Sequence, residues 1–223
     1  MLNAESITKS FGRVRALQRA SLTLAPGERL GLVGQSGSGK STLAQVLALL
    51  LEPDSGTVTI DGQRGGAWGV RAPRALRHRV QLVFQAPRQS IDPRLRVGDA
   101  ILEPLRASGL PRGDIEGVAA RVGLTPDLLE RFPHEVSEGQ LQRACLARAL
   151  IVRPRYLICD ELSSMLDVST QAALLEAIAH EQAERELGVL LITHDQVLAD
   201  HWCDSIVTLS ASRPRRSCPA QSP

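Results

Sequence analysis

The chain has few aromatic residues, with one Tyr, two Trp and three Phe among 223 residues. Proteins that bind single-stranded nucleic acid stack bases on aromatic side chains, so this shortage argues against such a platform. Neither sign of charge is in large excess, because 26 Lys and Arg against 24 Asp and Glu leave a formal net charge of +2. Nucleic-acid-binding domains carry a clear basic excess. The composition therefore predicts that nucleic acid is not a partner.

Long hydrophobic runs are missing as well. The longest, Val46 to Leu51, falls far short of the roughly 20 apolar residues that a membrane-crossing helix needs. Met1 to Glu5 lack the basic start and apolar core of a secretion signal. The four cysteines show no metal-ligand spacing; they are Cys145, Cys159, Cys203 and Cys218. We expect a reduced, cytosolic chain without a membrane span, in which Cys159 is a buried small hydrophobic residue.

A glycine-rich segment is the most informative feature that is present. It reads Gly34-Gln35-Ser36-Gly37-Ser38-Gly39-Lys40-Ser41-Thr42, and it fits the phosphate-binding pattern G-x-x-x-x-G-K-[ST] between an expected strand (29–33) and an expected helix (42–51). Glycines let backbone N–H groups turn toward a phosphate, and the helix N-terminus favours negative charge. Lys40 would reach the β- and γ-phosphates, and the Ser41 hydroxyl would ligate Mg²⁺. A Gly/Ser-rich linker would fit this pattern only by chance, so the segment predicts a nucleoside triphosphate site.

The hydrophobic periodicity predicts an α/β fold. Strands are expected at 2–10, 16–24, 56–60, 80–84, 156–160 and 188–192, and helices at 97–105, 114–122, 138–151 and 168–186. Near-continuous apolar strands that alternate with helices indicate a parallel sheet covered on both faces. We expect one domain over residues 1–210, a phosphate-loop α/β core with an antiparallel β subdomain and with a helical subdomain inserted at about 86–153. Residues 211–223 are rich in Ser, Pro and Arg and are expected to form a disordered tail.

Two adjacent acids follow the expected strand 156–160. Asp160 fits the carboxylate that holds Mg²⁺ through its water shell, and Glu161 fits the base that polarises an attacking water. Parallel α/β sheets bind ligands at the carboxyl ends of their strands, which is where these acids lie. A solvated Asp-Glu pair that opens a loop is the alternative. The complete phosphate loop 120 positions earlier favours the catalytic interpretation.

The segment Val136-Ser137-Glu138-Gly139-Gln140 precedes that strand. Here the chain resembles the ATP-binding cassette (ABC) ATPases, whose signature motif Leu-Ser-Gly-Gly-Gln opens a helix. In that family the signature of one subunit covers the γ-phosphate bound by its partner. Ser137, Gly139 and Gln140 match the motif, whereas Val136 and Glu138 depart from it. Ser137 and Gln140 also have capping-box spacing, and both interpretations can hold together.

The resemblance spans about Leu2 to Leu209 and implies further roles. Phe11 would contact the adenine ring, and Gln85 would sense Mg²⁺ and the transport subunit. Asp167, in a segment that resembles Ser-Ala-Leu-Asp, would lie at the dimer interface, and His194 would contact the γ-phosphate. The implied catalytic residues are Gln85, Glu161 and His194. The implied Mg²⁺ ligands are Ser41, Gln85 and Asp160. The implied ATP-binding residues are Phe11, Gly34, Gln35, Ser36, Gly37, Ser38, Gly39, Lys40, Ser41, Thr42, Ser137, Gly139, Gln140 and Asp167.

Within the family, segments 85–94, 103–105 and 166–171 resemble bacterial peptide and nickel importers. The resemblance implies two non-identical ATPases beneath two membrane-spanning permeases, on the cytoplasmic face of the membrane, served indirectly by a solute-binding protein. The chain departs from that group at Ala86 and Leu162. Its early end favours nickel and metal-chelate importers slightly. Three alternatives remain open: an ATPase of a phosphonate-degradation complex, a soluble ABC ATPase of translation or DNA repair, and a phosphate-loop kinase.

Glu138 is the most consequential departure. A carboxylate about 6 Å from the partner's γ-phosphate, at an effective dielectric constant near 20, would be repelled by roughly 3 kcal/mol per unit of phosphate charge. A homodimer would bear this repulsion at both sites, whereas pairing with an unaltered cassette confines it to one site. The residue therefore predicts an asymmetric heterodimer.

Overall fold

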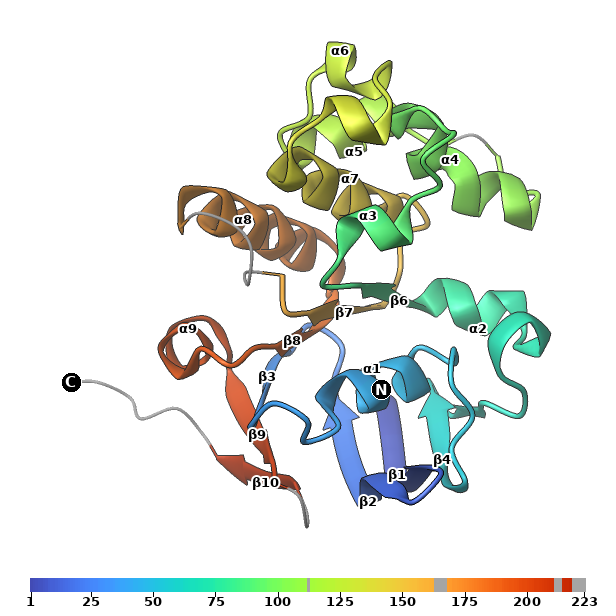
Figure 1. The fold of residues 1–223 in the computed structure, drawn as a ribbon, viewed down its shortest axis with the longest axis vertical. Helices are drawn as coiled ribbons and strands as arrows, with labels where there is room; N and C mark the ends of the chain where they lie inside the picture. Colours follow the sequence, from blue (N-terminus) through green and yellow to red (C-terminus); the bar gives the residue numbers. More distant parts are fainter. Residues whose placement is uncertain (112, 163–167, 211–213, 218–223) are drawn as a thin grey trace.

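The protein has two β-sheets, and the antiparallel one lies at the bottom of Figure 1, at the end of the molecule away from helices α4 to α6 (residues 97–129). The computed structural model describes residues 1–111, 113–162, 168–210 and 214–217. An antiparallel sheet has the order β2-β1-β4-β5, and its strands are β1 (Leu2–Phe11), β2 (Val14–Leu24), β4 (Ser55–Ile60) and β5 (Gln63–Arg64). A second sheet has the order β10-β9-β3-β8-β7-β6, and its strands are β3 (Arg29–Val33), β6 (Val80–Val83), β7 (Tyr156–Asp160), β8 (Gly188–Ile192), β9 (Ser205–Leu209) and β10 (Pro214–Ser217). All neighbours from β9 to β6 are parallel, which confirms the predicted α/β class.

The helices lie between the strands along the chain. Their bounds are α1 (Lys40–Leu47), α2 (Arg74–Arg79), α3 (Pro87–Ser90), α4 (Val97–Ser108), α5 (Ile115–Arg121), α6 (Pro126–Leu129), α7 (Glu138–Leu150), α8 (Val168–Arg185) and α9 (Gln196–Trp202). Helices α3 to α7 follow β6 and precede β7, in the part of the chain where a helical insertion is expected. No helix within the described ranges is long and apolar enough to cross a membrane. The helix expected to reach residue 51 ends at Leu47, and Leu49 has a left-handed φ of 58°.

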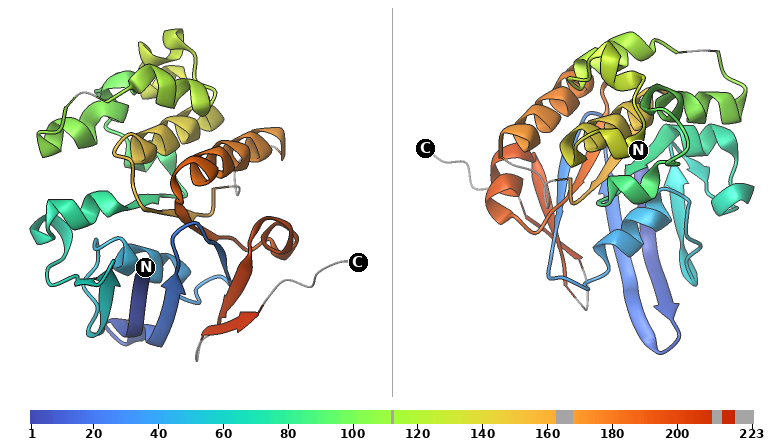
Figure 2. Two further views of the ribbon diagram at one scale, coloured as in Figure 1. Left: turned by 180° about the vertical axis from the view of Figure 1, so that it is seen from behind. Right: turned by 45° about the horizontal axis from the view of Figure 1, so that its top comes forward.

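The parallel sheet separates two hydrophobic cores. On β7, Leu157 and Cys159 face the core that contains α4, α7 and α8, whereas Tyr156 and Ile158 face the core that contains α1 and the antiparallel sheet. This alternation is the period of two of a strand buried on both faces. Helices α1 and α7 therefore cover opposite faces of the parallel sheet, as the two views of Figure 2 also indicate. Cys159 is fully buried, as predicted.

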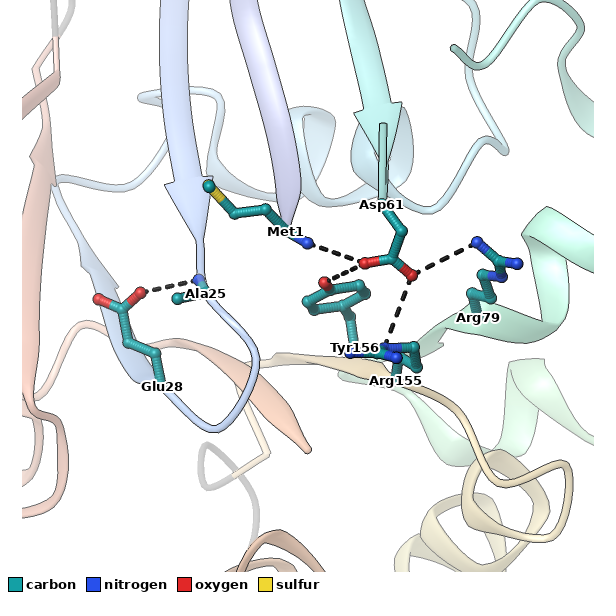
Figure 3. Close-up of polar contacts among 7 residues, drawn as sticks. All are labelled: Met1, Ala25, Glu28, Asp61, Arg79, Arg155 and Tyr156. Carbon is teal, nitrogen blue, oxygen red and sulfur yellow. Dashed lines mark hydrogen bonds and ion pairs between the residues drawn. The ribbon is translucent and has the colours of Figure 1, made fainter. Parts of the chain in front are cut away.

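Asp61 joins the antiparallel sheet to the start of β7 (Figure 3). Its Oδ1 atom accepts hydrogen bonds from the N-terminal amine of Met1 at 2.8 Å and from the Tyr156 hydroxyl at 2.7 Å. Its Oδ2 atom lies 3.4 Å from Nη1 of Arg79 and 3.6 Å from Nε of Arg155. Burial acts to raise the pKa of Asp61, but these hydrogen bonds and cationic neighbours outweigh it and hold the pKa below its usual range. The two sheets are thus connected through a charged carboxylate.

One segment of the expected disordered tail forms a strand. Pro214–Ser217 pairs antiparallel with β9 as β10, so the prediction of disorder is wrong for these four residues. Without β10, β9 would be the edge of the sheet, and the unpaired backbone groups of an edge strand accept a further strand readily. Residues 211–213 and 218–223 lie outside the described residues.

Candidate nucleotide-binding site

Residues 34–39 of the glycine-rich segment form a loop between β3 and α1, and residues 40–42 form the start of α1. Gly39 caps α1 with a φ of 97°, and Gly37 has a φ of 77°. Both values lie in the left-handed region that favours glycine. A Cβ atom on Gly39 would lie 2.3 Å from the carbonyl oxygen of Ala16 in β2. Glycine at this position therefore lets the loop pack directly against the antiparallel sheet.

Lys40, the first residue of α1, is buried against this loop, with 6% of its surface exposed. Its Nζ atom donates hydrogen bonds to the carbonyl oxygens of Gly34 at 2.8 Å and Gln35 at 3.0 Å. The hydroxyl of Ser38 is buried and has no hydrogen-bond partner among the described residues. An unsatisfied buried hydroxyl costs about 1–3 kcal/mol. An anionic ligand would give the ammonium a stronger acceptor and give the hydroxyl a partner.

Asp160 lies at the end of β7 and has 6% of its surface exposed. It accepts a hydrogen bond from the Ser41 hydroxyl, while its Oδ1 atom is buried and unpaired within the part of the chain that the structure describes. Burial raises the pKa of Asp160 and the charge of Glu161 adds to this, whereas the Ser41 bond and the Lys40 ammonium act to lower it. Mg²⁺ prefers oxygen ligands, and it would satisfy the unpaired carboxylate oxygen. Asp160 and Ser41 therefore fit a bound Mg²⁺.

The three predicted catalytic side chains lie together, with Glu161 between the other two. Gln85 donates from Nε2 to Oε2 of Glu161 at 2.7 Å, and Nδ1 of His194 lies 3.9 Å from Oε1. The three residues follow β6, β7 and β8, so they share the carboxyl edge of the parallel sheet. The φ of Glu161 is 49°, a strained value of the kind that clusters at functional sites. The arrangement can hold a carboxylate base between an amide and an imidazole.

The expected adenine contact, Phe11, lies at the end of β1 with 52% of its surface exposed. The Nζ atom of Lys9 is 5.8 Å from the centre of its ring. A cation over an aromatic face is a favourable contact, and it leaves the rest of this exposed ring accessible. Asp167, expected at a dimer interface, lies outside the described residues.

The signature residues Ser137, Gly139 and Gln140 lie at the N-terminus of α7. The Ser137 hydroxyl accepts from the Gln140 backbone N–H at 3.2 Å, and Gln140 Oε1 accepts from the Ser137 N–H at 2.9 Å. This is the capping box that the spacing predicts. Because α7 and α1 cover opposite faces of the sheet, the signature does not share a face with the phosphate loop of its own chain.

Two further residues in this region were not found by sequence reasoning. Arg88 in α3 donates from Nε to Oε2 of Glu138 at 2.8 Å. Gln142 in α7 is 2% exposed and donates to the carbonyl oxygen of Phe84 at 3.4 Å. These partners are 50 and 58 positions apart in the sequence. A buried glutamine on the apolar face of α7 was the one signal that could have indicated a tertiary hydrogen bond.

The family model that describes ABC transporters matches residues 17–164. The chain belongs to the ABC transporter ATPase family. It is 42% identical to a glutathione import ATP-binding protein, GsiA, from Pectobacterium atrosepticum, over 84% of this chain and 31% of that protein. It is 38% identical to a di/tripeptide transport ATP-binding protein, DppF, from Pseudomonas aeruginosa, over 97% of this chain and 69% of that one. The ATPase thus spans about a third of the length of the GsiA relatives.

Solved structures support the same fold. A dimeric ATP-binding cassette, MJ0796, bound to ADP and Pi, matches with a TM-score of 0.85 and 24% identity over the whole of both chains. A solved ATP-binding subunit of an ABC transporter matches with a TM-score of 0.84 and 26% identity, over 98% of the ATPase and 90% of that chain. These matches agree with the antiparallel sheet, the parallel sheet and the helices described above.

Proposed function

We propose that the ATPase hydrolyses ATP to drive a bacterial ABC importer for peptides. The observation that carries this proposal is the joint placement of Gln85, Glu161 and His194 at the edge of the sheet that also holds the phosphate loop. The names of the relatives, which concern glutathione and di/tripeptides, favour peptides over other solutes. The nickel and metal-chelate classes, which the resemblance of segments 85–94, 103–105 and 166–171 also implies, stay predictions.

The phosphate loop would bind the triphosphate. Lys40 would exchange its two carbonyl acceptors for β- and γ-phosphate oxygens, and residues 34–42 would present backbone N–H groups with the N-terminus of α1 behind them. Ser38 would gain a partner for its buried hydroxyl. Phe11 would contact the adenine. When bound by Ser41, Asp160 and Gln85, Mg²⁺ would neutralise phosphate charge.

Hydrolysis would use Glu161 as the general base. Its carboxylate would accept a proton from a water whose oxygen attacks the γ-phosphorus, and the bond from that phosphorus to the β-bridging oxygen would break to release ADP and phosphate. Gln85 fixes one carboxylate oxygen at 2.7 Å, which leaves Oε1 on the side of His194. His194 has 64% of its side chain exposed and would donate a hydrogen bond to the γ-phosphate.

The signature would act on a partner cassette. Ser137, Gly139 and Gln140, on the opposite face from the phosphate loop, would cover a triphosphate held by a second subunit. Asp167 would lie at the same interface. We propose that this second subunit is a non-identical ABC ATPase, which is the arrangement that the resemblance of segments 85–94, 103–105 and 166–171 to peptide and nickel importers implies.

Residues 86–104 would form the surface that docks a membrane-spanning permease. The whole complex would hold two permeases, and a solute-binding protein would act through them. This segment begins directly after Gln85 and holds Pro87, Pro93 and Pro104. It would place the ATPase as a peripheral protein on the cytoplasmic face of the membrane. The alternatives, an ATPase of a phosphonate-degradation complex or another soluble ABC ATPase, require soluble partners at this surface.

The test is peptide uptake by cells whose chromosomal copy is replaced by Glu161→Gln. We expect uptake of a labelled dipeptide or tripeptide to be lost, while nickel uptake is unchanged. A crosslinkable cysteine placed at Gln89 in native membranes should capture a permease. Loss of nickel uptake alone would favour the metal-importer class, and capture of soluble enzymes alone would favour the phosphonate-degradation complex.

A further inference from the structure

The carboxylate of Glu138, in the first turn of α7, is held by one arginine of α3. Arg88 donates from Nε to Oε2 of Glu138 at 2.8 Å, from Nη1 to the carbonyl oxygen of Pro133 at 3.2 Å and from Nη2 to that of Val136 at 3.4 Å. All three guanidinium nitrogens therefore contact the segment 133–138 that leads into the signature. A planar guanidinium is suited to such fixed, multiple donation.

Helix α3 is fixed to α7 at two further points. The Sγ atom of Cys145 donates to the carbonyl oxygen of Pro87 at 3.9 Å, and Nη1 of Arg148 donates to the carbonyl oxygen of Ser90. These contacts flank Arg88 on both sides along α3. The guanidinium is therefore delivered to Glu138 by a helix whose own position is set, and not by a freely moving loop.

The charge of Glu138 opposes the use of this helix N-terminus for phosphate. A carboxylate in the first turn is attracted to the positive end of the helix dipole, but it also cancels part of the charge that would attract a phosphate. The pair with Arg88 has no net charge. It also holds the Glu138 carboxylate against α3, with 34% of the glutamate side chain and 50% of the arginine side chain exposed.

We propose that Arg88 is a positioning residue that makes a glutamate acceptable in the signature. It neutralises Glu138 and keeps its carboxylate on α3, so that Ser137, Gly139 and Gln140 can approach the triphosphate of the partner cassette. This inference rests on the proposed function, in which the signature completes the site of a second subunit. It assigns to Arg88 and Glu138 a joint role in closing the cassette dimer.

The test measures ATP-driven dimer closure by sedimentation, with the ATPase purified together with its partner cassette. Every variant carries Glu161→Gln, and the corresponding glutamate of the partner cassette is also replaced by Gln, so that neither site turns over. We expect Arg88→Ala to raise the ATP concentration for half-maximal closure by about tenfold, as an unscreened carboxylate repels phosphate. Glu138→Gly alone should change it by less than about twofold. The double variant Arg88→Ala/Glu138→Gly should return to within about twofold of the starting protein. Arg88→Lys keeps the positive charge but not the planar multiple donation, so its closure should fall between that of Arg88→Ala and that of the starting protein.

Two controls separate charge from structure. Arg131→Ala removes an arginine of the helical insertion, outside residues 86–104, whose carboxylate partner is Asp127, and it should leave closure unchanged. Higher salt should reduce the defect of Arg88→Ala, because screening weakens repulsion between exposed charges. A double variant as defective as Arg88→Ala would overturn the proposal and assign Arg88 to its backbone contacts. Failure of every protein to close with ATP would instead overturn the proposed function, and the inference with it.

Discussion

Gln85 and Glu161 share a hydrogen bond of 2.7 Å although 76 positions separate them in the sequence. Gln85 follows β6 and directly precedes the segment that enters α3, whereas Glu161 follows β7. The bond therefore connects the proposed base to the proposed permease-docking segment. A displacement of α3 that carries Gln85 with it would remove a donor from the carboxylate. Docking of a permease on this segment would therefore act, through Gln85, on the carboxylate that accepts the proton from the reacting water.

Glu161→Gln should keep ATP binding and lower hydrolysis by about a hundredfold or more, because an amide cannot accept the proton from water. The side-chain shape is conserved, and the glutamine oxygen can still accept the hydrogen bond from Gln85. Steady-state phosphate release by the ATPase with its partner, together with nucleotide trapped per site, checks this result. Release above half of the wild-type rate, with both sites turning over, would show that Glu161 is not the base.

Gly39→Ala and Gly37→Ala form a matched pair in the phosphate loop. A Cβ atom at Gly39 would meet the backbone oxygen of Ala16 at 2.3 Å, whereas one at Gly37 meets no atom of the described chain within 4 Å. Gly37→Ala should cost about 1–2 kcal/mol of stability from its left-handed φ alone. Gly39→Ala must in addition displace the loop, and it should weaken ATP binding by more than about tenfold. Equal ATP affinities of the two variants, measured by equilibrium titration, would contradict the steric argument.

Asp61→Asn should destabilise the protein at neutral pH by about 1–3 kcal/mol, since it weakens the bonds to the Met1 amine and Tyr156. The pKa of Asp61 is below its ordinary value of 3.8, so its contribution is fully present above that value. It is lost as the pH falls through the lowered pKa. Urea denaturation at a series of pH values should therefore show the difference from wild type shrinking in acid.

Asp54→Asn is the control for this series. The Asp54 carboxylate pairs with Lys9 on the surface, with 44% of its side chain exposed, and exposed pairs contribute little. The stability that Asp54→Asn loses at neutral pH should be clearly smaller than the stability that Asp61→Asn loses. A difference for Asp61→Asn that persists undiminished in strong acid would show that packing, and not the charge, connects the two sheets.

Local patterns predicted most of the fold. The apolar runs at 156–160 and 188–192 became β7 and β8 without a change of bounds, because strands buried on both faces leave a continuous hydrophobic signal. The short helices α3 and α6 had no such signal, since four residues do not complete a periodic pattern. The strand β10 was not predicted from the sequence. Its extended structure depends on pairing with β9 and not on the composition of its own residues.

The candidate site was predictable to a similar degree. Motifs named Gln85, Glu161 and His194, and the order of parallel strands implied that they share an edge, but their mutual contacts required the fold. The ion pair of Arg88 with Glu138 could not be predicted. A sequence of this kind gives no sign that an arginine of one helix and a glutamate of another will meet, because their approach depends on how α3 packs against α7.

A buried carboxylate connects the helical insertion to the core. Glu181 in α8 has no exposed surface, and its Oε1 atom lies 2.5 Å from Nε of Arg121 in α5, while Oε2 faces Arg185. Burial and the neighbouring arginines Arg153 and Arg121 lower the pKa of Arg185. The two arginines of the cluster therefore depend on the single negative charge of Glu181 to compensate their burial.

Glu181→Gln should remove that charge and leave both arginines without the counterion that they have among the described residues. Breaking a fully buried ion pair costs about 3–5 kcal/mol, and we expect a loss of about 2 kcal/mol here because Arg121 and Arg185 keep 31% and 25% of their side chains exposed. Urea denaturation measures the loss. Glu184→Gln, on the same helix with 55% of its side chain exposed, is the control and should change stability by less than about 0.5 kcal/mol. Equal, small effects of the two substitutions would mean that the charge of Glu181 does not hold α5 to α8.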